Sequence, residues 1–287
     1  MVLEYVLGPR GAERKPWLMI PIGAVYTFLA YFVAGILFPE HIGLVIVFLI
    51  TIASIPVIYD AMKLEEREDV EEQDEVNVLI HHGRALLFFT CLFIGFLIGF
   101  SALYVMLPLE QAQAAFSVQI RTINSINAPV SGRAVSGFEN SVAYFITIFV
   151  NNFKVVLFCL LFSFVYGAGA IFILAWNAST MGVAIGNFIR ISYDYLLKKS
   201  LPAPVAYAGA SAMGLLRYSI HGIPEMFAYF VAGLAGGIIS VAIIRHDLGT
   251  KRFEKIILDA SDLIIIALLV LLLAALLEVY VTPLFFS

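Results

Sequence analysis

Long uncharged apolar runs, separated by short polar segments, are the dominant pattern along this chain. The clearest run, 226–244, follows His221-Gly222-Ile223-Pro224-Glu225 and ends at Arg245-His246. At a rise of about 1.5 Å per residue, a helix of this length crosses a hydrocarbon core about 30 Å thick. Pro224 suits the first turn of such a helix, where Glu225 would lie near the positive end of the helix dipole. The pattern therefore predicts a transmembrane helix that begins beside an ionisable pair.

The remaining runs extend this pattern to an all-α, polytopic membrane bundle of about seven transmembrane helices. The first two spans form a hairpin. A weakly apolar stretch at 202–216 predicts an additional surface-lying or re-entrant helix. The predicted spans cover residues 17–38, 42–59, 85–107, two passes within 142–190, 226–244 and 263–282.

The segment 142–190 leaves two alternatives open. Its length suits two spans, and the expected break is Tyr166-Gly167-Ala168-Gly169. In that case the polar residues between 151 and 154 lie inside the fourth span. Alternatively, 142–152 is an interfacial helix, and the chain enters the membrane near Phe153. Periodicity favours neither alternative.

Composition supports the membrane assignment. Of the 287 residues, 61% are hydrophobic and 13% are charged, whereas soluble domains have about 25% charged residues. The continuous apolar runs also differ from the alternating pattern of a β-barrel. The formal net charge of −4 comes from the acidic segment 60–77, which we interpret as a solvated loop or helix end. Nucleic acid is not an expected partner. Cys91 and Cys159 lie in apolar runs and are expected to be free and buried.

Basic residues predict the orientation of the chain. The N-terminal segment and the segment 245–255 are basic, so the positive-inside rule places both in the cytoplasm. Seven spans then give a multi-pass cell-membrane protein with a cytoplasmic N-terminus and its C-terminus outside, although the basic residues between 190 and 199 count against this. The predicted organisation is an N-terminal hairpin at 1–59, an acidic cytoplasmic loop at 60–84 and a five-span core at 85–287.

Polar and ionisable residues within or beside the predicted spans form the candidate site. The predicted orientation places them in the outer half of the membrane, where burial is costly unless each group finds a partner. Glu278 is the hardest to explain as a simple structural residue, and its expected partner is Lys154 or His221. Asn151 and Asn152 have a plainer interpretation as a contact between helices. The predicted intramembrane cluster comprises Asn151, Asn152, Lys154, Asn177, Asn187, His221, Glu225 and Glu278.

Pairs of glycines recur with four-residue spacing on three different spans. Such small-xxx-small spacing lets helices approach each other closely, and here it motivates the expectation of a homo-oligomer. The predicted helix-packing glycines are Gly95 and Gly99, Gly182 and Gly186, and Gly233 and Gly237.

His221 and Glu225 also have the four-residue spacing of metal ligands on one helix. Gly222 and Pro224 argue against a continuous helix through both residues. A metallohydrolase would need a third ligand, for which Glu278 is the obvious donor. The chain contains no His-Glu-x-x-His, Gly-x-Ser-x-Gly or phosphate-loop motif. We therefore expect no catalytic, cofactor or metal site, with a membrane metallohydrolase as a minor alternative.

A series of short motifs in the second half of the chain points to a known family. They are Asn151-Asn152, Tyr166-Gly167-Ala168-Gly169, Asn177, Gly182-Val183-Ala184-Ile185-Gly186, His221-Gly222-Ile223-Pro224-Glu225 and Glu278-Val279-Tyr280-Val281-Thr282-Pro283. In this order they resemble the stage II sporulation protein M (SpoIIM) family of integral membrane proteins, over roughly 85–283.

This resemblance implies a five-helix core with its C-terminus outside, and a scaffold rather than an enzyme. The best-known members recruit cell-wall hydrolases during engulfment in spore-forming bacteria. The implied partners are therefore the lipid bilayer and a membrane or envelope protein. The chain departs from the simplest family pattern by its first two spans and its acidic segment, so the identity of that partner does not carry over. The alternative function is a small-solute or ion transporter or channel that uses the intramembrane polar cluster.

Overall fold

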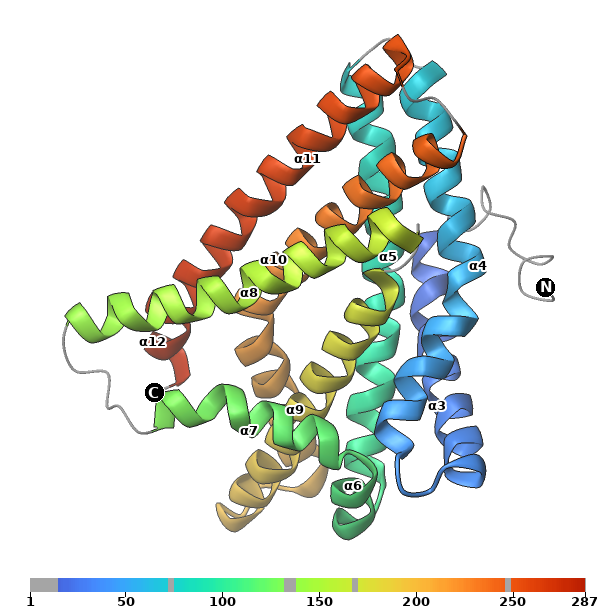
Figure 1. Ribbon diagram of the computed structural model, residues 1–287. Helices are drawn as coiled ribbons and strands as arrows, with labels where there is room; N and C mark the ends of the chain where they lie inside the picture. The colour runs from blue at the N-terminus through green and yellow to red at the C-terminus, as the bar shows by residue number, and fades with distance from the viewer. Residues whose placement is uncertain (1–14, 72–74, 132–137, 167–169, 246–248, 287) are drawn as a thin grey trace.

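The computed structural model describes residues 15–71, 75–131, 138–166, 170–245 and 249–286, and every element in these ranges is helical. The short helices are η1 (Pro16–Leu18), α6 (Leu109–Ala115), the π-helix η2 (Leu277–Val281) and α12 (Thr282–Phe286). The longer helices, shown in Figure 1, are α3 (Met19–Leu37), α4 (Ile42–Glu71), α5 (Glu75–Met106), α7 (Ser117–Ser131), α8 (Phe138–Tyr166), α9 (Ala170–Lys198), α10 (Ala203–Ile244) and α11 (Lys251–Leu276).

Six of these helices are long and apolar enough to cross a membrane, and α4 adds a shorter apolar stretch at Ile42–Pro56. The prediction of an all-α membrane bundle with about seven spans is therefore confirmed. The turn between α3 and α4, the helices α6 and α7, and the turn between α9 and α10 lie at one end of the molecule (Figure 1). The last turns of α4 and α10 lie at the opposite end.

The helices α5, α9 and α10 form the centre of the bundle. Between 56% and 78% of the residues in their apolar windows are buried, compared with 17% to 28% in α3, α8 and α11. Many large apolar side chains on the outer helices are exposed. Because lipid tails are as apolar as these side chains, such a surface needs no protein cover within a membrane.

Close backbone contacts at glycines join the central helices to their neighbours. A side chain at Gly95 of α5 would collide with the backbone carbonyl oxygens of Met19 and Ile20. The other predicted glycines for which contacts are known also lie tightly against neighbouring helices: Gly99 on Thr27, Gly182 on Phe100, Gly186 on Tyr104 and Gly233 on Ala170, while Gly237 is buried within α10. These glycines therefore serve close contacts within the chain.

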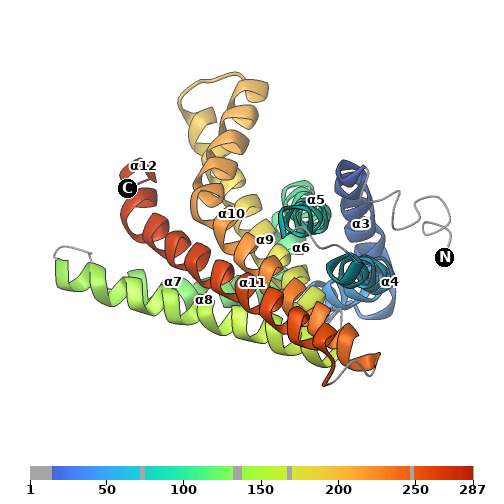
Figure 2. The same cartoon turned by 90° about the horizontal axis from the view of Figure 1, so that it is seen from above.

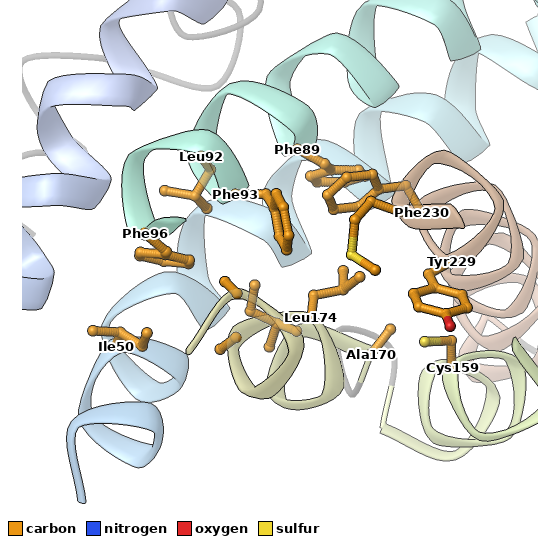
Figure 3. Close-up of a cluster of buried hydrophobic side chains, with 14 of the residues drawn as sticks. Ile50, Phe89, Leu92, Phe93, Phe96, Cys159, Ala170, Leu174, Tyr229 and Phe230 are labelled. Atoms are coloured by element: carbon orange, nitrogen blue, oxygen red, sulfur yellow. The ribbon is translucent and has the colours of Figure 1, made fainter. Parts of the chain in front are cut away.

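Aromatic side chains fill the space between α5 and α10. The rings of Phe93 and Phe230 meet edge to face with their centroids 5.7 Å apart, and Phe89 stacks on Phe230 at 6.4 Å (Figure 3). Beside them is a cavity of about 20 Å³ lined by apolar residues, among them Leu174 of α9. A water molecule there would lack hydrogen-bond partners. This part of the bundle is therefore dry.

The course of α10 differs from the sequence prediction. The stretch 202–216 is not a separate surface-lying or re-entrant helix, because it forms the first part of α10, which continues to Ile244. The expectation that Gly222 and Pro224 would prevent a continuous helix is also wrong. Proline removes one hydrogen bond from a helix interior, and packing against neighbouring helices compensates for that loss within a bundle. The helix bends along its length instead of ending (Figure 1, Figure 2).

The structure also decides between the two alternatives for 142–190. Since α8 is continuous from Phe138 to Tyr166, the stretch 142–152 is part of the same helix as the rest of the span and not a separate interfacial helix. The ends of α8 and α9 flank the predicted break, whose residues 167–169 lie outside the described residues. Helices α4 and α5 extend into the acidic segment 60–77 from both sides, and residues 72–74 of that segment also lie outside the description.

The contact between α3 and α5 can be tested by replacing Gly95 with valine. The new side chain would meet backbone carbonyl oxygens, which cannot move aside as a flexible side chain can. We expect Gly95→Val to lower the stability of the detergent-solubilised protein by about 1–3 kcal/mol, which is typical of overpacking. The measurement is the midpoint of thermal unfolding.

The matched control is Gly35→Ala, also at a helical glycine of the N-terminal hairpin. A Cβ atom at Gly35 would have no neighbour within 4 Å, so this change should leave stability unchanged or raise it slightly, because alanine favours the helix. Equal midpoints for the two variants would show that the close approach at Gly95 is not needed.

Candidate functional site

A polar cluster lies where α10 meets the C-terminal helices. The Tyr229 hydroxyl donates a hydrogen bond of 2.6 Å to Oε1 of Glu225. The two residues are four apart in α10 and therefore share one face of the helix. Tyr229 is 0% exposed, so its hydroxyl depends on this carboxyl group for a hydrogen-bond partner. Figure 3 shows Cys159 of α8 beside the Tyr229 side chain.

Glu278 lies in the π-helix η2, where the backbone N–H of Thr282 bonds to the carbonyl oxygen of Leu277. The following Pro283 has no N–H with which to continue an α-helix. The Thr282 hydroxyl donates to the same Leu277 oxygen at 3.2 Å and lies 3.4 Å from Nδ1 of His221. The Thr282 hydroxyl thus lies between the Leu277 oxygen and the His221 ring, at the junction of α10 and η2. Single π-turns of this kind are frequent at functional sites.

The carboxyl groups of Glu225 and Glu278 are close enough to interact electrostatically. Neither forms an ion pair with another residue in the described part of the chain. Intramembrane carboxyl groups are rare and are costly to leave unpaired, so this pair is the polar feature of the bundle that is hardest to explain by packing alone. Among the described residues there is no group of three or more His, Cys, Asp and Glu side chains arranged for a metal ion.

The structure brings together three of the eight predicted cluster residues: His221, Glu225 and Glu278. Lys154 is exposed on α8, and no hydrogen bond or ion pair joins it to Glu278. The pairing expected between these two residues is therefore wrong. His221 contacts Thr282 instead of pairing with Glu278. The remaining cluster members are asparagines, and within the described chain no hydrogen bond joins them to these three residues.

The asparagines make separate structural contacts. Asn152 is 7% exposed and accepts a hydrogen bond of 3.4 Å from Nδ2 of its neighbour Asn151. Asn177 donates to the carbonyl oxygen of Ile173 in its own helix at 2.8 Å. Asn187 accepts a hydrogen bond of 3.4 Å from the hydroxyl of Tyr104, which joins α9 to α5. Only the Asn187 contact joins two helices, whereas the contacts of Asn151, Asn152 and Asn177 lie within their own helices.

Arg190 has a role that the sequence analysis missed. Its Nε donates to the carbonyl oxygen of Tyr104 at 3.0 Å, and its Nη2 donates to those of Val105 and Leu107. These oxygens belong to the C-terminal end of α5, where carbonyl groups have no partner within the helix. A signal was present in the sequence, because Arg190 follows Gly186 by four residues and therefore lies on the glycine face that packs against α5.

Gln119 of α7 is a second buried polar residue that the sequence analysis missed. Its Nε2 donates to the carbonyl oxygen of Gly43 at 3.0 Å and lies 3.3 Å from Oγ of Ser179. Its Oε1 is buried and has no hydrogen-bond partner among the residues that the structure describes. These contacts fasten α7 to α4 and α9. Nothing in the local sequence distinguishes Gln119 from the polar residues around it.

Comparison with known proteins now identifies the family. The model of the stage II sporulation protein M family matches residues 24–283. The chain belongs to the SpoIIM family. An uncharacterized protein of Methanocaldococcus jannaschii is similar, with 25% identity over 183 residues, which is 62% of this chain and 93% of that protein. No solved structure matches. The SpoIIM match includes most of the first hairpin, so it begins well before residue 85, where the sequence motifs placed it.

The bond between Glu225 and Tyr229 can be tested by truncating its acceptor. Glu225→Leu leaves a buried hydroxyl without a partner and should lower stability by about 1–3 kcal/mol. Glu225→Gln retains an acceptor and should lower stability less. The measurement is thermal unfolding in detergent. In a Tyr229→Phe background, Glu225→Leu should lower stability less, because no hydroxyl is left unpaired. An equal loss of stability in both backgrounds would show that the hydrogen bond between Glu225 and Tyr229 does not contribute.

The Arg190 contacts predict a graded effect on stability. Arg190→Leu removes all the donors to the end of α5 and should lower stability by about 1.5–3 kcal/mol, as for hydrogen bonds to charged groups. Arg190→Lys keeps the charge without the planar fork and should give an intermediate loss. Lys198→Leu, at an exposed position of the same helix, is the control. If Arg190→Leu lowered stability no more than Lys198→Leu, the hydrogen bonds from Arg190 to the end of α5 would not stabilise the protein.

Proposed function

We propose that this SpoIIM protein is a non-catalytic membrane scaffold that recruits another membrane or envelope protein. The observation that carries the proposal is the dry and closely packed interior of the bundle. The central helices meet at glycines, and the cavity between α5, α9 and α10 is apolar. The polar side chains of α8, α9 and α10 mostly bond to their neighbours within the chain. Such an interior favours a structural role over the passage of a solute.

The outer surface supports the same proposal. The outer helices α3, α8 and α11 bury few of their residues, so they leave broad apolar faces on which other transmembrane helices can pack. The family resemblance adds a scaffold role with the C-terminus outside, and the basic N-terminal segment favours a cytoplasmic N-terminus. In this proposal the partner is held by packing and polar contacts within the membrane.

Proton-coupled transport is the second candidate, and the carboxyl pair favours it. Glu225 follows a helix-interior proline, and Glu278 lies in a π-helix. Irregular helices and intramembrane carboxyl groups are both common in transporters. A transporter would need these carboxyl groups to exchange protons with water on at least one side of the membrane.

Proton flux into proteoliposomes separates the two functions. A scaffold should leave the decay of an imposed pH gradient equal to that of protein-free liposomes, as reported by a trapped pH-sensitive dye. A transporter should speed the decay, and Glu278→Gln should abolish the increase. Glu110→Gln, at an exposed position of α6, is the matched control. A flux that depends on Glu278 but not on Glu110 would overturn the scaffold proposal.

A further inference from the structure

We draw no further inference here: the strongest candidate, the carboxyl pair of Glu225 and Glu278 where α10 meets η2, belongs to the site already described, and nothing else in the described part of the chain identifies a ligand for it.

Discussion

The close approach of α5 to its neighbours is the constraint on which the rest of the structure depends. Within a membrane, apolar side chains gain nothing by leaving lipid for protein, so helices associate through packing and hydrogen bonds. Gly95 brings the backbone of α5 against α3, and Gly182 of α9 brings the backbone of α9 against α5. Both contacts depend on the absence of a side chain. The central position of α5 follows from these two contacts.

Hydrogen bonds from polar side chains add to the glycine contacts between helices. Where α5 ends, its carbonyl oxygens would be costly to leave unpaired, and Arg190 of α9 binds three of them. Gln119 joins α7 to α4 and α9 in the same way. At the other side of α10, Tyr229 and Glu225 satisfy each other within one helix. Several of the polar contacts thus lie at a helix end or beside a helix irregularity, and the centre between α5 and α10 is filled by aromatic side chains.

The sequence predicted the spans because the transfer of an apolar run into lipid is a local property of that run. It also predicted the close contacts at Gly95 and Gly182, since small residues four apart have few other uses within a membrane. The sequence wrongly predicted a helix break near Pro224, because packing against neighbouring helices keeps α10 continuous. That packing is a tertiary effect, which a local sequence pattern does not contain. The pairing of Glu278 with Lys154 failed for a related reason. Two side chains at a similar depth make contact only when both point into the bundle. The sequence did not show which face of α8 packs against the other helices.

The two faces of α8 differ in what they contribute to the stability of the bundle. Asn152 and Cys159 pack against the bundle, whereas the face that carries Lys154 adds no contact within the described chain. Only 17% of the residues in the apolar window of α8 are buried, so most of its side chains can change without creating cavities or clashes. The glycine contacts of α5, α9 and α10 hold the bundle independently of that face. The outer surface of α8 can therefore vary in sequence while the centre of the bundle stays the same.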